Sequence, residues 1–279
     1  MERGESLHIG VNKVDPAHYN GWEGTLRACE FDAQDMEALA QAKGFTASML
    51  LTKEATAEAV GAGIARAAEQ LADGDIFLLT YSGHGGQAPD TNSDDQADMK
   101  DETWVLYDRQ LVDDELYALF GRFRPGVRIS MLSDSCHSGS VARDIFDVAV
   151  PHVVAQAMVD ADEPRTKDLP DKVQAATNRQ HAATYDRIQA ENPSGETQEL
   201  AASLLLLSGC QDNQLSLDGD RNGLFTQQLL AVWDGGGWAG GYEPFHKAIG
   251  ARMPPTQSPN YFRTGVPNPR FEAETPFTI

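Results

Sequence analysis

Two stretches decide the fold of this chain: Asp75-Ile-Phe-Leu-Leu-Thr-Tyr-Ser-Gly-His-Gly85 and Val127-Arg-Ile-Ser-Met-Leu-Ser-Asp-Ser-Cys-His-Ser-Gly139. Each begins as an apolar run, which is typical of a buried parallel strand, and each ends in a polar turn rich in Ser and Gly. In an open parallel sheet, chemistry collects at the carboxyl ends of the strands. The sequence therefore predicts that neighbouring strands present His84 and Cys136 to one crevice.

An imidazole beside a thiol is what nucleophilic acyl transfer needs. The thiolate is the nucleophile, an ordinary thiol has a pKa near ~8.5, and an imidazole can take its proton and return it to a leaving amine. Gly85 and Gly139 lack a Cβ, so backbone amides can approach a substrate carbonyl. We expect the amides of Gly85 and Cys136 to form the oxyanion hole. His137 is the rival base, ranked lower because consecutive residues at a strand exit diverge.

The remaining sequence alternates between strand and helix signals. This alternation predicts an α/β fold, with a mainly parallel central β-sheet flanked by helices on both faces. The expected strands are 7–11, 48–51, 75–81, 103–107, 127–132 and 204–207, with a further edge strand near the end of the chain; the expected helices are 25–43, 56–71, 113–122, 171–190 and 225–233.

Composition limits the class of protein. A chain of 279 residues with 41% hydrophobic content can form one large core, and its net charge of −20 argues against binding nucleic-acid phosphates. No apolar run is long enough to span a membrane, and the first residues lack a signal-peptide pattern, so we expect a cytoplasmic protein. Three cysteines without CxxC spacing argue against disulfides and zinc. We expect a monomer without an organic cofactor.

Several motifs together resemble those of the metacaspases, a family of caspase-like cysteine peptidases. They are Tyr81-Ser-Gly-His-Gly85, Asp134-Ser-Cys-His-Ser-Gly139, Leu7-His-Ile-Gly-Val-Asn12, Leu26-Arg-Ala-Cys-Glu-Phe-Asp-Ala33 and Ser208-Gly-Cys-Gln-Asp-Asn-Gln214. The first two are specific, since they are similar to the family's His and Cys motifs almost letter for letter. The resemblance implies a cysteine endopeptidase, of the prokaryotic single-chain type.

The resemblance also implies an organisation. It covers most of residues 7–144 and 201–279, so we expect one caspase-like domain over 1–279. This domain would contain a large portion, 1–144, and a small portion, 201–279. The polar segment 145–200, with four prolines, is interpreted as an insertion between them that could act as a flap.

Two carboxylates suggest the substrate specificity. Asp134 precedes Cys136 by two residues, so strand alternation aims it into the crevice, and the resemblance assigns both Asp134 and Asp32 to the S1 pocket. Two acidic groups in a partly desolvated pocket would select Arg or Lys at P1, the substrate residue before the cleaved bond. Alternatively, Asp32 is a first-turn helix carboxylate and Asp134 holds the turn around Cys136.

A second group of carboxylates is Asp101, Asp113 and Asp114. Oxygen ligands suit Ca²⁺, and this arrangement resembles the calcium-binding part of metacaspases, in which the ion activates the enzyme. A fourth family ligand lies one position before Asp144, where this chain has Arg143. The alternative is that Asp113 caps a helix.

The stretch Asp218-x-Asp220-x-Asn222-Gly223 imitates the start of an EF-hand loop. It has Leu229 where the bidentate Glu is required. We therefore expect an acidic loop without strong cation binding.

Residues 145–200 are predicted to be where the enzyme cuts itself. The polarity and prolines of this segment suggest exposure. Its basic residues, each acceptable to an acidic S1 pocket, are Arg165, Lys167, Lys172, Arg179 and Arg187. A solvated insertion without a regulatory role is the alternative.

Two other functions remain open. One is a caspase-fold peptidase of the separase or legumain kind, with a different P1 preference. The other is a catalytically silent module that binds partners through its acidic face, against which the intact Cys136 and His84 argue.

Overall fold

The computed structural model describes residues 2–91, 100–135, 165–192, 199–210, 214 and 216–279. Predictions that involve Cys136, His137, Gly139 or residues 143–144 lie outside the described residues.

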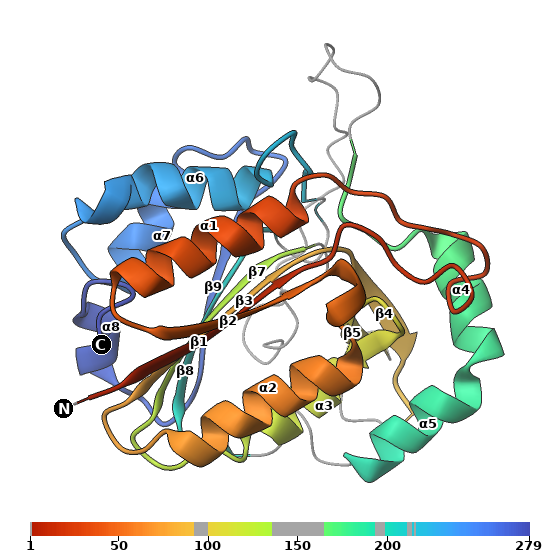
Figure 1. The fold of residues 1–279 in the computed structure, drawn as a ribbon, viewed down its shortest axis with the longest axis horizontal. Helices are drawn as coiled ribbons and strands as arrows, with labels where there is room; N and C mark the ends of the chain where they lie inside the picture. Colours follow the sequence, from red (N-terminus) through yellow and green to blue (C-terminus); the bar gives the residue numbers. More distant parts are fainter. Residues whose placement is uncertain (1, 92–99, 136–164, 193–198, 211–213, 215) are drawn as a thin grey trace.

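The centre of the molecule is a six-stranded sheet (Figure 1). Its order is β2-β1-β3-β7-β8-β9, and all neighbours are parallel except β8 and β9. The strands are β1 Gly4–Gly10, β2 Thr46–Leu51, β3 Ile76–Ser82, β7 Arg128–Asp134, β8 Ser203–Ser208 and β9 Asn260–Gly265. The predicted α/β fold with a mainly parallel sheet is confirmed, and β9 is the expected edge strand.

Helices cover both faces of this sheet (Figure 1). In β3, Ile76 and Leu78 pack on the side of α1, α6 and α7, whereas Phe77 and Leu79 pack on the side of α2 and α3. The apolar run of β3 is continuous because both faces are buried. The helices are α1 Cys29–Ala42, α2 Ala57–Gln70, α3 Asp113–Phe120, α6 Leu224–Trp233, α7 Tyr242–Gly250 and α8 Pro269–Ala273.

A second, antiparallel sheet follows β3. It consists of β4 Gly85–Pro89, β5 Lys100–Val105 and β6 Gln110–Val112. The polar, acidic composition of residues 88–101 predicts a loop, but both ends of this range belong to strands, 88–89 to β4 and 100–101 to β5. The run Gly-Gly-Gln-Ala-Pro of β4 has no alternation of apolar residues, and its strand form comes from pairing with β5.

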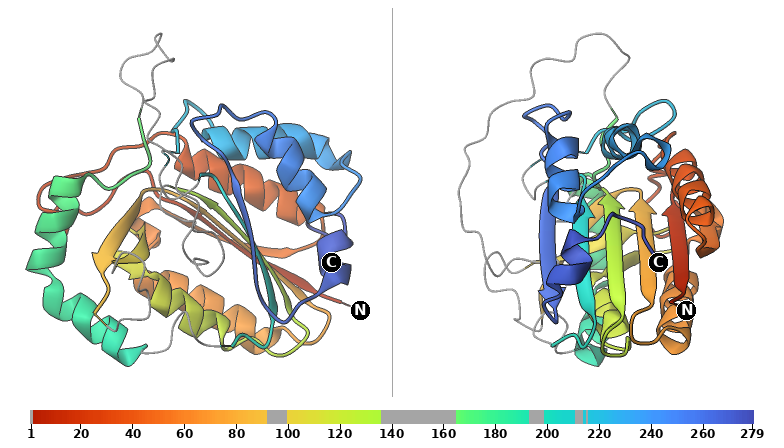
Figure 2. Two further views of the ribbon diagram at one scale, coloured as in Figure 1. Left: turned by 180° about the vertical axis from the view of Figure 1, so that it is seen from behind. Right: turned by 90° about the vertical axis from the view of Figure 1, so that its left-hand side faces the viewer.

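The described part of the insertion forms two helices where one was predicted, α4 Asp171–Gln180 and α5 Ala182–Glu191. The chain bends at His181, whose ring stacks on His18 at 3.9 Å between centroids. α4 and α5 lie together at one side of the molecule (Figure 2), with Tyr185 and Ile188 packed against Val112. Within the described residues, no helix has the length and apolarity required to cross a membrane.

Candidate active site

The carboxyl ends of β3 and β7 lie side by side, as predicted. Ser82 pairs with Asp134 in the parallel register, so the turn with His84 and the residues after Asp134 leave the sheet together. Tyr81 fixes the His84 turn, because its hydroxyl donates to the His84 carbonyl at 2.6 Å and to the Val105 carbonyl at 3.1 Å. Cys136 itself is outside the described residues.

His84 is held as a neutral base. Its Nε2 lies 2.9 Å from the carbonyl oxygen of Gly24, which can only accept, so the proton is on Nε2 and Nδ1 carries the lone pair. Among the described residues, the buried Nδ1 has no hydrogen-bond partner. Burial lowers the pKa of His84 to about 4, against the opposing effect of the Gly24 carbonyl. The ring packs on Trp22, 4.8 Å away between centroids.

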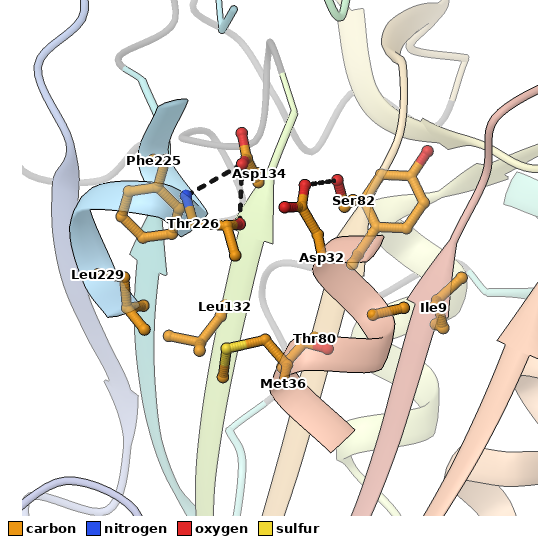
Figure 3. Close-up of a pocket in the computed structure, with 12 residues that line it drawn as sticks. Ile9, Asp32, Met36, Thr80, Ser82, Leu132, Asp134, Phe225, Thr226 and Leu229 are labelled. Carbon is orange, nitrogen blue, oxygen red and sulfur yellow. Dashed lines mark hydrogen bonds between the residues drawn. The ribbon is translucent and has the colours of Figure 1, made fainter. Parts of the chain in front are cut away.

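Asp32 and Asp134 face each other across a small pocket (Figure 3). Asp32 comes from the first turns of α1 and Asp134 from the end of β7, and both are 2% exposed. The remainder of the pocket is lined by polar residues, among them Thr80, Ser82 and Thr226, and by apolar residues, namely Ile9, Ala33, Met36, Leu132, Phe225 and Leu229. The structure thus brings the two predicted pocket carboxylates together.

Each carboxylate is held by other segments of the chain. Asp32 accepts hydrogen bonds from the Ser82 hydroxyl at 2.6 Å and the Gly223 amide at 3.0 Å. Asp134 accepts from the hydroxyls of Ser216 at 2.7 Å and Thr226 at 2.8 Å. None of these donors belongs to the first turn of α1 or to the turn after β7. Asp32 nevertheless lies in the first turn of α1, where the helix-dipole alternative places it, and the turn around Cys136 lies outside the described residues, so neither alternative is tested by these contacts.

The ammonium of Lys167 lies between the two carboxylates. Its Nζ is 3.2 Å from Asp32 Oδ2, 3.2 Å from Asp134 Oδ2 and 2.9 Å from Ser82 Oγ, which together use its three donors. The Lys167 side chain is 0% exposed, so the predicted exposure of the insertion is wrong at this residue. Gly223 leaves the necessary space, since a Cβ there would lie 2.2 Å from Nζ.

Burial and charge act in opposite directions on this triad. Burial raises the pKa of Asp32 to about 6, against the attraction of Lys167, and the nearby Asp134 adds to the rise. Burial alone would lower the pKa of Lys167, but attraction by the carboxylates of Asp134 and Asp32 raises it well above its ordinary value. Lys167 is therefore charged at neutral pH.

The backbone around Lys167 is paired on both sides, with a bend at Lys167 between two isolated β-bridges. Its amide donates to the Ser216 carbonyl at 2.9 Å, and its carbonyl accepts from the Gly85 amide at 3.0 Å. Leu169 N then donates to the Gly85 carbonyl at 2.8 Å. This is the β-addition by which sheets bind extended peptides. The strand-like pairing was not predicted, because residues 165–169 have no alternating apolar pattern.

The three carboxylates predicted to bind calcium lie elsewhere, at β5 and the start of α3. All are buried, and the amide of Gln189 donates to Asp101 Oδ2. The Asp113 carboxylate accepts hydrogen bonds from the backbone amides of Glu102 and Asp114. Val112, and not Asp113, occupies the N-cap position of α3. In the described parts of the chain, no three His, Cys, Asp or Glu side chains are arranged to hold a metal ion.

These features define a class of protein. It is an α/β protein with a buried neutral histidine and an acidic pocket at the carboxyl edge of a parallel sheet. Residues 9–271 match the model of the peptidase C14 family, the caspase domain. The chain belongs to this family of cysteine peptidases.

Individual relatives agree with this assignment. Metacaspase-1 of Mycosarcoma maydis is 29% identical over 246 residues, which cover 80% of this chain and 59% of that protein. Metacaspase-4 of Arabidopsis thaliana is 33% identical over 147 residues, covering 49% and 34% of the two chains. The chain thus spans less than two thirds of the length of these relatives.

Two crystal structures are similar in fold. A protein of Geobacter sulfurreducens is 47% identical, with a TM-score of 0.84, and the match covers 99% of this chain and 98% of that one. Caspase-1 from Spodoptera frugiperda has a TM-score of 0.53 at 11% identity, covering 95% and 86%. The second match confirms the caspase-like fold only.

Proposed function

We propose that this chain is a cysteine endopeptidase that cleaves proteins or peptides after Lys or Arg, with Cys136 as nucleophile and His84 as base. The observation that supports this specificity is the position of the Lys167 side chain. The ammonium of a lysine of the chain itself lies between Asp32 and Asp134, while the backbone carbonyl oxygen of this lysine accepts a hydrogen bond from the Gly85 amide. A lysine so bound has the interactions expected of a P1 residue.

The chemistry follows from this pose. His84 Nδ1 takes the proton of the Cys136 thiol, and the sulfur bonds to the P1 carbonyl carbon. In this proposal, the developing oxyanion is stabilised by the backbone amides of Gly85 and Cys136. The bond to the leaving nitrogen breaks as that nitrogen receives the proton from His84, and water then hydrolyses the thioester.

The same pose supports autoprocessing. If Lys167 is bound as P1, the cleaved bond is that between Lys167 and Asp168. Residues 165–169 then shield the pocket until they are cut or displaced. Among the five basic residues predicted as cleavage sites, Lys167 is favoured by these interactions.

Calcium activation is a further part of the proposal. Asp101, Asp113 and Asp114 are buried and offer only oxygen, the ligand type that Ca²⁺ prefers, but their present arrangement does not form a metal site, so calcium binding requires these side chains to rearrange. The Gln189 amide hydrogens now face Asp101, so a cation at that oxygen requires Gln189 to move. Gln189 lies on α5, in the same segment as Lys167, and this links the two sites.

A substrate panel tests the function directly. Purified chain is assayed in the cytoplasmic pH range on fluorogenic peptides ending in Arg, Lys, Asp or Asn, with and without Ca²⁺. We expect cleavage after Arg and Lys only. Cleavage after Asn or another residue would favour the legumain-like or separase-like alternative. The absence of any cleavage, with the fold intact, would favour a silent binding module.

A further inference from the structure

Residues 165–167 pair with residues 216–218 as neighbouring antiparallel strands do. Two backbone hydrogen bonds of 2.9 Å and a β-bridge join the ranges. Arg165 and Lys167 flank the bridged Thr166, and both side chains reach carboxylates, Arg165 that of Asp218 and Lys167 those of Asp32 and Asp134. If Lys167 is P1, Arg165 is P3.

Arg165 forms an ion pair with the buried carboxylate of Asp218. Its Nε donates to Asp218 Oδ2 at 3.0 Å, and the Asp218 side chain is 0% exposed while that of Arg165 is 29% exposed. A second, weaker partner is Asp220, 3.5 Å from a terminal guanidinium nitrogen and 90% exposed. The acidic loop with the incomplete EF-hand pattern thus holds a guanidinium group.

Asp218 is fixed independently of Arg165. Its two carboxylate oxygens accept hydrogen bonds from the backbone amides of Arg27, at 2.9 Å, and Ala28, at 3.1 Å, which directly precede α1. These bonds do not involve residues 165–169. The carboxylate therefore keeps its orientation when that segment leaves, and a buried anion with a remaining acceptor site favours a cationic partner.

We propose that Asp218 forms a second basic subsite, which selects Arg at P3 in peptides that carry Lys or Arg at P1. The inference rests on the proposed function and names its substrate class, an Arg-x-Lys/Arg sequence. Arg is preferred to Lys because its planar guanidinium can donate to Asp218 and reach Asp220 at once. The exposed Asp220 contributes less, since water screens its charge.

Peptide binding tests the subsite without requiring catalysis. The full chain carries Cys136→Ala, with Arg165→Ala and Lys167→Ala to remove both anchors of its own segment. Fluorescein-labelled Arg-Thr-Lys-Asp-Leu and Ala-Thr-Lys-Asp-Leu are titrated by fluorescence polarisation. We expect the Ala peptide to bind about tenfold more weakly, the scale of a charge-assisted hydrogen bond at a partly exposed site. Asp218→Asn should reduce this difference to less than about threefold, and Asp220→Asn should leave most of it.

The outcomes separate this inference from the proposed function. Equal binding of the two peptides overturns the P3 subsite and leaves the lysine pocket intact. Failure of both to bind overturns both. Selective binding that depends on Asp218, with no cleavage by the chain that retains Cys136, supports the subsite and overturns the peptidase. If Asp218→Asn lowers the melting temperature too far for a binding assay, a peptide with Glu at P3 is used in place of this variant. If the Glu peptide binds as tightly as the Arg peptide, the inference is contradicted.

Discussion

At the scale of single residues, the site depends on a buried triad of two carboxylates and one ammonium. Removing one member of such a group leaves an unpaired charge in a desolvated place, which is strongly unfavourable. Asp32 and Asp134 therefore require a cation, whether it comes from Lys167 or from a substrate. This requirement is the physical basis of the proposed specificity, and in this structure it is met by Lys167.

Asp134→Asn should lower kcat/KM for Lys and Arg substrates. The ammonium or guanidinium of P1 would lose a desolvated partner, a loss of roughly 2–5 kcal/mol. The measurement is kinetics on Arg and Lys peptides alongside melting temperature. Glu58→Gln, on the exposed side of α2, is the matched change of charge and should have no effect. Unchanged cleavage by Asp134→Asn would show that the S1 assignment is wrong.

His84→Ala should reduce kcat by about 10²–10⁴-fold, the usual contribution of a positioned acid–base group. Cys136→Ala should abolish cleavage, because no other residue in our proposal attacks the carbonyl. Both are measured by turnover of a fluorogenic Arg peptide, with circular dichroism as the check on folding. Normal turnover by the His84→Ala chain would contradict the proposed pairing of Cys136 with His84. His137 would then be tested as the base.

At the scale of elements, the sequence predicts what local pattern determines. The apolar runs of β3 and β7 predict buried parallel strands, and the polar turns after them predict where the site lies. By contrast, β4 and residues 165–169 carry no periodic pattern, and the backbone of each is fixed by pairing with distant segments of the chain. Lys167 was one of five similar basic residues. Only its long-range partners Asp32, Asp134 and Ser216 distinguish it.

Lys167→Ala should prevent self-cleavage between residues 167 and 168, whereas Lys167→Arg should permit it. Alanine offers the acidic pocket no cation, while arginine does. The matched control is Lys172→Ala, an exposed residue five positions later on α4. Mass spectrometry of the new termini, after incubation with Ca²⁺, identifies the cut. Cleavage of the Lys167→Ala chain at the same bond would contradict the proposed pose.

Gln189→Ala should increase the affinity for Ca²⁺, and Asp114→Asn should decrease it. The first change removes the amide that competes at Asp101, and the second removes charge from the donor set. Titration calorimetry of the Cys136→Ala chain measures binding without self-cleavage. Asp186→Asn, an exposed carboxylate on α5, serves as the control. If neither variant alters calcium binding, the ion binds somewhere other than this cluster.

At the scale of the whole molecule, stability should depend on buried neutral histidines. Burial lowers the pKa of His8 to about 3, and that of His84 and His18 to about 4. The unfolded chain binds protons at these residues below pH 6.5, and the folded chain does not until near pH 4. Stability is therefore complete above pH 6.5 and falls as the pH is lowered through this range. Asp32 has the opposite effect, because its raised pKa favours the folded state as the pH falls below about 6.

Burial also lowers the pKa of His246 and raises that of Glu5, and the four histidines together outweigh the two carboxylates, so the melting temperature should fall between pH 7.5 and pH 4.5. Each unit of pKa difference corresponds to about 1.4 kcal/mol. His8 provides a variant away from the active site, since its ring bonds only Ser6 and Thr80, both at 2.9 Å, among the side-chain contacts of the described chain. His8→Gln can retain hydrogen bonds to both hydroxyls and cannot be protonated, so its melting temperature should fall less steeply. A melting temperature that stays constant down to pH 4.5 in the Cys136→Ala chain, or an equal slope in His8→Gln, would contradict the argument. In the second case, His8 would not be the neutral, buried base that its place in β1 implies.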